Sequence, residues 1–336
     1  MLAGALVLLL MLLVVGAALF AFVCLMMARA LLSPPRMVGG QALWMLRRLT
    51  PDDLGMPFEE IWSEVRDEKS GQKIDIAAWW IPAAGTGASD RCALIVHGYA
   101  DSKIGGIAWA PVFRAMGYHV LAIDLRAHGR SGGRHTTGAF FERHDLSQVI
   151  DQIRAQRPTE TQNLILFGVS LGAAVVGATA ALRHRDGIDA VIMDCPYADY
   201  VSAAHTHAGV MGMPGPLFQR IAVAWAQRIS GADFHACAPV KVIPTIACPL
   251  MVIHGADDLF IDKPDMDAVE AATRSRPPEL GLTVYWRAAD THHVLAVRTD
   301  PNEFRLRIEA FLKAALTPQA RSATDEPHMK TLVQER

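Results

Sequence analysis

The chain begins with its longest uninterrupted apolar segment. Residues 1–32 read MLAGALVLLLMLLVVGAALFAFVCLMMARALL and carry no charged side chain before Arg29. An apolar run of about 20 residues is long enough to span a bilayer as a helix. The segment lacks the basic start and the short apolar core of a cleaved signal peptide. The pattern therefore predicts a retained transmembrane helix over residues 1–32.

Basic residues lie on only one side of this apolar core. Arg29, Arg36, Arg47 and Arg48 follow it, and no Lys or Arg precedes it. Because segments rich in Lys and Arg stay on the cytoplasmic side of a span, we expect a single-pass protein of the cell (inner) membrane with its following domain in the cytoplasm. Pro and Gly residues make residues 33–57 a juxtamembrane linker in this interpretation.

Short apolar runs alternate with amphipathic segments along the rest of the chain. The runs predict strands at 58–66, 73–81, 93–96, 118–123, 163–167, 188–193, 249–253 and 282–286. Helical periodicity predicts helices at 142–154, 171–183, 264–274 and 301–316. The first two strands form a hairpin in this interpretation, and the later alternation predicts an α/β fold. We expect a mostly parallel, doubly wound sheet with antiparallel strands at its start.

One interval breaks this alternation. Residues 196–245 show no clear strand pattern and are rich in Met, Gly and Pro before an amphipathic stretch. We interpret them as a small helical lid over a site, with a plain helical connection as the alternative. The predicted α/β domain thus covers residues 58–316. The polar residues 317–336 have the composition of a disordered tail.

Composition and charge narrow the classes of function. The 336 residues are 51% hydrophobic, and 32 Lys and Arg nearly balance 34 Asp and Glu. No basic stripe is present, so we expect no nucleic-acid partner. The five cysteines are scattered and form no Cys-x-x-Cys pair, a pattern typical of reduced thiols rather than of disulfides or a zinc site. We expect no metal and no organic cofactor, and the oligomeric state stays open.

A serine between two glycines lies where a strand pattern ends and a helix pattern begins. Residues 168–172 read Gly-Val-Ser-Leu-Gly and match G-x-S-x-G, which marks a strained turn that exposes a nucleophilic serine. A motif of five loosely specified positions also occurs by chance, so the rest of the chain must decide whether this serine is a nucleophile. A serine nucleophile needs a histidine base, a carboxylate that orients the base, and donors for the oxyanion.

Candidates for the carboxylate and the base follow later strands in the required order. Asp257 and Asp258 follow the strand at 249–253, and His292 and His293 follow the strand at 282–286. Each pair alone is ordinary, because a surface Asp pair is usually a turn or a helix cap and a His pair is usually solvated. Their joint order after Ser170 is much harder to obtain by accident.

Candidates for the oxyanion donors are backbone amides. The sequence LIVHGYADSK turns sharply at Gly98 after a predicted strand, which would expose the amide of Tyr99. The second donor is the amide of Leu171, directly after the serine. His97 and His254 more often support loops than perform chemistry, so neither is assigned a catalytic role.

Together these motifs resemble the α/β-hydrolase superfamily over about residues 60–316. The resemblance is to the small-lid serine hydrolases of the serine-aminopeptidase-like and membrane-anchored acyl-hydrolase branches. It implies that Ser170 is the nucleophile. The family's H-G-x-x-D-x-x-V box aligns with residues 254–261, which selects Asp258 and places Ile261 where the family has Val.

The resemblance also implies which histidine is the base and which amides bind the oxyanion. The family's histidine commonly precedes a proline that opens the last helix, and the spacing to Pro301 favours His293 over His292. The amides of Tyr99 and Leu171 match the family's oxyanion donors. A further stretch, DLRAHGRSGG, resembles a supporting loop of the family, with Ala127 in place of its Gly.

The implied chemistry is acyl transfer to water through an acyl-enzyme on Ser170. We expect a membrane-anchored serine hydrolase that cleaves carboxylic ester or thioester bonds of a small-molecule or lipid-like acyl substrate. A peptidase or amidase of the same fold stays open, as does a catalytically silent hydrolase fold that binds a partner or lipid. An apolar set in the presumed lid lines an acyl pocket or packs the lid onto the body: Val210, Met211, Met213, Leu217 and Phe218.

Overall fold

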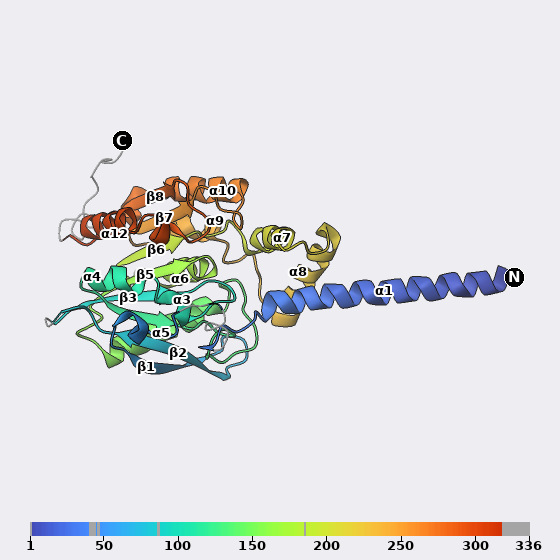
Figure 1. Ribbon diagram of the computed structural model, residues 1–336, viewed down its shortest axis with the longest axis horizontal. Coiled ribbons are helices and arrows are strands. Elements are labelled where there is room, and N and C mark those ends of the chain that lie inside the picture. Colours follow the sequence, from blue (N-terminus) through green and yellow to red (C-terminus); the bar gives the residue numbers. More distant parts are fainter. Residues whose placement is uncertain (1, 40–44, 46–47, 86–87, 185, 318–336) are drawn as a thin grey trace.

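The computed structural model describes residues 2–39, 45, 48–85, 88–184 and 186–317 (Figure 1). The predicted tail at 317–336 lies outside the described residues except for Thr317, and so do residues 40–44 and 46–47 of the predicted linker. Eight strands form one sheet in the order β1-β2-β4-β3-β5-β6-β7-β8. Their bounds are β1 Glu59–Arg66, β2 Lys73–Ile81, β3 Arg91–Val96, β4 His119–Ile123, β5 Asn163–Val169, β6 Ala190–Asp194, β7 Leu250–Gly255 and β8 Thr283–Ala288.

The strand directions match the expected α/β fold. β1 pairs with β2, and β2 with β4, in the antiparallel sense. The pairs from β4 through β3, β5, β6 and β7 to β8 are all parallel. Each of the eight predicted apolar runs forms one of these strands. The prediction of a mostly parallel sheet with an antiparallel start is therefore confirmed.

Helices cover both faces of the sheet because the central strands are apolar on both sides. In β5, Leu164 and Leu166 join one hydrophobic core, whereas Ile165 and Phe167 join the other, as the two-residue period of a strand requires. The first core contains side chains of α5 (Glu142–Gln156), α6 (Leu171–Arg183) and α10 (Lys263–Arg274). The second contains side chains of α3 (Lys103–Gly106), α4 (Ala110–Ala115), α11 (Ala296–Thr299) and α12 (Pro301–Ala315).

The interval at 196–245, every residue of which is described, contains helices and no strand, as expected. The helices are α7 Tyr200–Val210, α8 Pro216–Ser230 and the short α9 Pro239–Val242. α7 and α8 leave the body beside the amino-terminal helix (Figure 1). The interval is therefore helical, as both the lid and the plain helical connection predict, and α7 and α8 project from the body (Figure 1).

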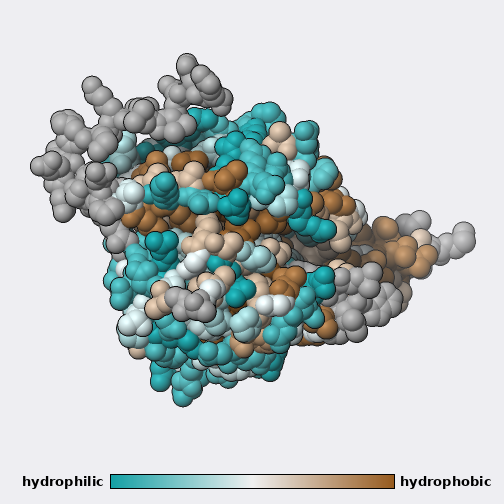
Figure 2. Space-filling model, turned by 60° about the vertical axis from the view of Figure 1, so that its left-hand side comes forward, coloured by the Kyte–Doolittle hydropathy of each residue, from teal (hydrophilic) through white to brown (hydrophobic). Residues whose placement is uncertain are grey.

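The amino-terminal helix α1 (Leu2–Leu32) has two different halves. It is the one helix within the described part of the chain that is long and apolar enough to cross a membrane. Residues 3–19 are exposed, whereas Cys24, Ala28 and Leu32 are fully or almost fully buried. In Figure 2, hydrophilic residues cover the upper and lower parts of this face of the body, hydrophobic residues lie between them, and the apolar helix runs away behind the body.

The last turn of α1 is bonded to the body through its backbone. The carbonyl oxygen of Ala30 accepts a hydrogen bond from the Tyr99 hydroxyl. Those of Leu31 and Leu32 accept from the Tyr200 hydroxyl at 3.1 Å and from the Thr136 amide at 2.8 Å. These bonds satisfy carbonyls that a helix end leaves without intrahelical partners. A boundary drawn at residue 32 therefore cuts through a packed region, because the final turns of α1 share the core of the body.

Candidate active site

Ser170 occupies a strained turn between β5 and α6. Its φ is 54° and its ψ is −115°, a backbone conformation that costs energy for a residue with a Cβ and that clusters at functional sites. The Ser170 amide donates to the carbonyl oxygen of Asp194 at 2.8 Å, which ties the turn to the end of β6. The side chain is half-buried rather than sealed in the core.

Both glycines of the motif are required by close backbone packing. A Cβ on Gly168 would lie 2.2 Å from the carbonyl oxygen of Gly172, and a Cβ on Gly172 would lie 2.2 Å from that of Val96. No side chain fits at either distance. The glycines at 168 and 172 are therefore required by the packing of this strand–turn–helix, which is the geometry that the G-x-S-x-G motif predicts.

The loop after β3 reaches the same place. A Cβ on Gly98 would lie 3.4 Å from Cβ and 4.0 Å from Oγ of Ser170. His97 holds the Gly98 carbonyl, to which its Nδ1 donates at 2.7 Å, while its Nε2 accepts from the Leu125 amide at 3.0 Å. Burial lowers the pKa of His97, so the neutral ring that this bonding pattern requires is favoured. Tyr99 follows this fixed turn.

The amide of Leu171 has the other position expected of an oxyanion donor. It is the first amide of α6, and the first amides of a helix lack intrahelical acceptors. The positive end of the helix dipole favours a negative charge there. Leu171 thus follows Ser170 directly, and Tyr99 follows Gly98, whose added Cβ would lie 3.4 Å from Ser170 Cβ.

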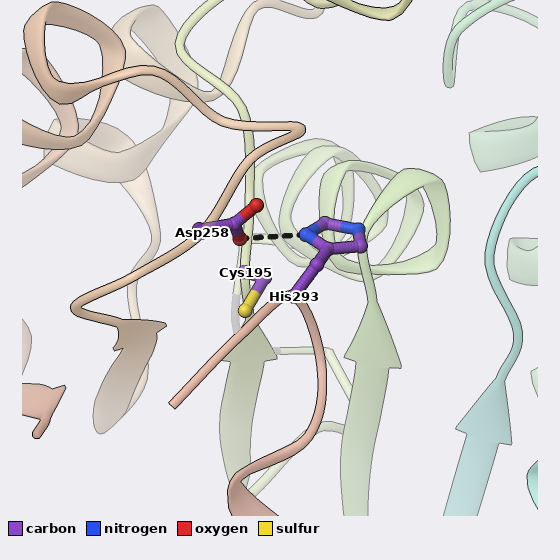
Figure 3. Close-up of side chains that lie close together, drawn as sticks. All are labelled: Cys195, Asp258 and His293. Carbon is purple, nitrogen blue, oxygen red and sulfur yellow. Dashed lines mark hydrogen bonds and ion pairs between the residues drawn. The ribbon is translucent and has the colours of Figure 1, made fainter. Parts of the chain in front are cut away.

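Asp258 is buried and forms a pair with the partly exposed His293. His293 Nδ1 lies 2.6 Å from Asp258 Oδ2 (Figure 3), while Asp258 Oδ1 accepts from the amides of Phe260 and Ile261 at 2.8 and 3.0 Å. Burial by itself would raise the pKa of Asp258. The hydrogen bond and charge of His293, together with the two amides, outweigh burial and lower it. The carboxylate is thus held ionised beside the imidazole.

Asp257 and His292 make a different contact. The Nδ1 of His292 donates to the backbone carbonyl of Asp257 at 2.8 Å, and both residues are exposed. The Asp257 carboxylate is therefore not the partner of either histidine in a described hydrogen bond. The structure brings Asp258 and His293 together and leaves their neighbours at the surface.

His254 and Gly255, which open the H-G-x-x-D-x-x-V box, have a packing role. A Cβ on Gly255 would lie 2.3 Å from the carbonyl oxygen of Thr291 and 2.7 Å from that of His292, so only glycine lets the histidine loop approach β7. His254 is buried and donates from Nε2 to the Pro196 carbonyl at 2.7 Å. Burial lowers its pKa to about 4, which keeps it a neutral structural group.

The His293 loop reaches Ser170 through the end of β6. The amide of Val294 donates to Cys195 Sγ at 3.3 Å, and Cys195 follows Asp194, whose carbonyl accepts from the Ser170 amide. Among the described residues, no hydrogen bond joins Ser170 Oγ to His293. Such bonds are often long without substrate and shorten when it binds.

The sequence interpretation missed Asp194 and Cys195 as neighbours of the site. Burial raises the pKa of Asp194 to about 7, and the charge of His293 acts in the opposite direction. A signal was available, because both residues directly follow the predicted strand at 188–193, as the other candidates follow theirs. The signal is weak because Asp194 and Cys195 have apolar neighbours in the sequence MDCPY, residues 193–197.

Cys195, Asp258 and His293 also form the one described group with metal-ligand character. Their ligand atoms lie within 4.8 Å of one another (Figure 3). Sulfur, carboxylate and imidazole suit zinc. Nδ1 of His293 and Oδ2 of Asp258 already bond to each other, so a metal would have to displace the proton between them.

The helix α7 contributes a second missed feature. The ring of His207 lies 5.2 Å from that of Phe260 and 6.4 Å from that of Tyr99, and Phe260 lies 5.5 Å from His293. These ring contacts connect α7 both to Tyr99, in the loop after β3, and to Phe260, which lies beside His293. Burial, followed by the charge of His293, lowers the pKa of His207.

Neither role expected of the apolar set, lining an acyl pocket or packing the lid onto the body, holds for most of its members. Val210, Met211, Met213 and Leu217 are exposed, because they lie at the outer tip that joins α7 to α8. Phe218 packs on Phe20 of α1 instead, with ring centroids 4.4 Å apart. A cavity of about 480 Å³ lies at the opposite sheet edge, near Arg91 and Leu316, away from Ser170.

The DLRAHGRSGG loop is a supporting element. Asp124 forms a buried ion pair with Lys103 at 2.7 Å, and Arg126 bonds Asp145 at 2.5 and 2.6 Å. Ala127 has a φ of 60°, a left-handed conformation in which glycine is preferred. The loop therefore keeps the backbone that the family's glycine would adopt.

Comparisons with known proteins agree with this architecture. A family model described as "Serine aminopeptidase, S33" matches residues 87–238. The uncharacterized protein YqkD of Bacillus subtilis is 27% identical over 65% of this chain and 70% of its own. The uncharacterized protein YfhR of Escherichia coli K12 is 25% identical over 75% of this chain and 80% of its own.

Two further similarities involve proteins with informative names. The protein named lysophosphatidylserine lipase ABHD12 of Macaca fascicularis is 28% identical over 54% of this chain and 47% of its own. The solved structure of the Pyrococcus furiosus esterase Pf2001 has a TM-score of 0.67 at 23% identity, covering 85% of this chain and 99% of that one. This chain has the α/β-hydrolase fold, and the family match together with the named relatives supports a hydrolase.

Proposed function

We propose that the chain is a membrane-anchored serine hydrolase that cleaves a carboxylic ester or thioester through a Ser170–His293–Asp258 triad. The observation that carries this proposal is the Asp258–His293 pair at 2.6 Å, whose loop bonds to Cys195 at the strand end that also bonds the Ser170 turn. All three residue types of a triad follow the carboxyl ends of parallel strands, Ser170 after β5, Asp258 after β7 and His293 after β8, where α/β sheets place their sites.

The proposed mechanism follows the roles that such a triad performs. His293 Nε2 removes the Ser170 proton while Oγ attacks the substrate carbonyl, and Asp258 stabilises the resulting imidazolium. The amides of Tyr99 and Leu171 receive the oxyanion. His293 then protonates the leaving group, and water repeats the cycle on the acyl-enzyme.

Membrane anchoring by α1 is supported by what its removal would expose. Cleavage of α1 would uncover the surface that Cys24, Ala28 and Leu32 bury and would leave the Tyr99 hydroxyl without its helix partner. A signal peptide is discarded and has no such role. We therefore propose a retained, single-pass anchor in the cell (inner) membrane, with the catalytic body in the cytoplasm as the arginines after the span suggest.

The substrate class is proposed from location and from named relatives. An anchored body lies next to lipid-borne esters, and the names of two relatives are those of a lipase and an esterase. The description of the matching family model favours a second candidate, an amidase or peptidase on the same site. No nucleic acid enters either proposal.

The test is labelling and turnover by the full-length protein in lipid vesicles. Ser170→Ala should abolish fluorophosphonate labelling and nearly all ester hydrolysis, since the nucleophile is removed, while circular dichroism stays unchanged. Full labelling of this variant would reject the assignment, and no labelling of the native protein would favour a silent binding protein. Acyl esters assayed beside aminoacyl amides distinguish the esterase from the peptidase.

A further inference from the structure

The tip that joins α7 to α8 is an exposed apolar surface, which we define as residues 209–218. Val210 is 49%, Met211 65%, Met213 38% and Leu217 62% exposed. Single exposed apolar side chains are ordinary on soluble proteins, but a cluster marks an interaction site. The catalytic geometry described above does not use this cluster.

The tip lies next to α1, and its contacts define its position along the axis of that helix. Phe218 contacts Phe20 with ring centroids 4.4 Å apart, and α8 packs along α1 where that helix enters the body (Figure 1). Phe20 is also the first half-buried residue after the exposed stretch of α1. The tip is therefore level with the point at which α1 leaves protein contacts.

The length of the exposed stretch of α1, compared with the thickness of a bilayer, shows where the tip lies relative to the membrane when α1 spans it. Residues 3–19 number 17 and extend about 26 Å at ~1.5 Å per residue. The hydrocarbon core of a bilayer is about 30 Å thick. When α1 spans, the exposed stretch is thus slightly too short, and the hydrocarbon boundary falls at or just beyond Phe20, beside the tip.

Charge around the tip suits a lipid surface. The chain has no Asp or Glu between Asp199 and Asp233. The charged residues of that interval are Arg220 and Arg228, both exposed on α8, and Arg29 is exposed near the end of α1. Arginines that flank an apolar insertion favour anionic headgroups.

We propose that the α7–α8 tip inserts into the headgroup–acyl boundary of the leaflet beside α1, so that the catalytic entrance faces the membrane. This inference rests on the membrane anchoring proposed above. The same α7 that leads to the tip carries His207, which contacts Phe260 and Tyr99 at the site. The substrate class that fits is an amphiphile resident in that leaflet, with its reactive carbonyl near the interface.

The depth of the tip is measured on the full chain in vesicles of phosphatidylethanolamine and phosphatidylglycerol. Met211→Cys, Leu9→Cys and Leu306→Cys each receive an environment-sensitive fluorophore. The five native cysteines are buried, and the unmutated protein gives their background. Lipids carry a nitroxide quencher either near the headgroup or near the end of the acyl chain.

We expect Met211→Cys to be quenched by the shallow nitroxide, Leu9→Cys by the deep one, and Leu306→Cys, on the far helix α12, by neither. Quenching at Leu9 without quenching at Met211 overturns the tip insertion and leaves the anchor intact. A blue-shifted but unquenched Met211 probe indicates a protein contact and also overturns it. Absence of quenching at Leu9 rejects the anchor and the insertion together.

An activity measurement provides an independent readout. Met211→Glu should lower hydrolysis of a vesicle-borne acyl ester several-fold, because a charge opposes insertion, and should leave hydrolysis of a short water-soluble ester unchanged. Leu306→Glu is the matched control, since Leu306 is also a large, exposed apolar side chain and lies on the far helix α12. Equal rates of Met211→Glu and native protein on the vesicle substrate contradict the insertion.

Discussion

Two aspartate–histidine pairs join the same two loops. The pairs are adjacent in sequence, but they differ in burial and in the atoms that make the contact. The inner pair, Asp258 and His293, is a side-chain contact of 2.6 Å with the carboxylate sealed from solvent. The outer pair, Asp257 and His292, meets through a backbone carbonyl at the surface. The comparison teaches that adjacency in sequence says little about role. The direction in which the backbone points each side chain decides whether it can orient a base.

The largest expected effect is the difference in kcat/KM between the two histidine variants. His293→Ala should lower kcat/KM by about 10⁴-fold or more, because removal of a triad base leaves only binding and oxyanion stabilisation. His292→Ala removes an exposed ring and should stay close to native turnover. Steady-state hydrolysis of a soluble ester measures both. A larger loss in His292→Ala would exchange the roles of the two pairs.

The aspartates should follow the same order with a smaller effect. Asp258→Asn should reduce kcat by about 10²–10⁴-fold, since an amide no longer stabilises the imidazolium. Asp257→Asn keeps the backbone carbonyl that His292 contacts and should change little. Both are measured on the same ester, with fluorophosphonate labelling as a check that Ser170 stays accessible. Equal losses in the two variants would remove the distinction.

A glycine substitution should disturb both pairs at once. Gly255→Ala places a Cβ 2.3 Å from the Thr291 carbonyl and should lower the free energy of unfolding by about 1–3 kcal/mol as the loop is forced away. Activity should fall with it. Gly209→Ala is the matched control, because nothing lies within 4 Å of its added Cβ. Chemical denaturation that finds the two variants equally stable would contradict the close approach.

Acid provides the smallest and most specific test of the inner pair. The pKa of Asp258 is lowered from 3.8, so its ionised form contributes stability above pH 3.8 that disappears as the pH falls through the lower folded value. The difference in unfolding free energy between native protein and Asp258→Asn should therefore shrink below pH 3.8. Urea denaturation across that range measures it, and a constant difference would argue against the ion pair.

Much of this site could be predicted because its signals are local. Buried strands are continuous apolar runs, and polar residues directly after them identify the sheet edge that carries chemistry. The distinction of Asp258 from Asp257 came from resemblance and not from periodicity. Asp194 and Cys195 carried the same local signal, but their apolar surroundings disguised it.

The features that could not be predicted depend on contacts between distant segments. Nothing in the period of residues 1–32 separates an exposed stretch from one that is buried, since both are apolar. His207 and Phe260 come from distant segments and meet only in the folded chain. Likewise, Val210 and Met211 have the composition of a pocket lining, and only their place at a tip shows that they face outward.

The hydrogen bonds at the end of α1 affect how the protein can be divided into modules. A chain that starts at Met45 lacks the helix turn that accepts from Tyr99 and Tyr200, so its catalytic body differs from that of the full protein. Chimeras that exchange anchors between such hydrolases therefore need their junction before Phe20 rather than after Leu32. If α1 is the proposed anchor, the anchor and the catalytic body overlap by about a dozen residues, roughly three helical turns, that serve both.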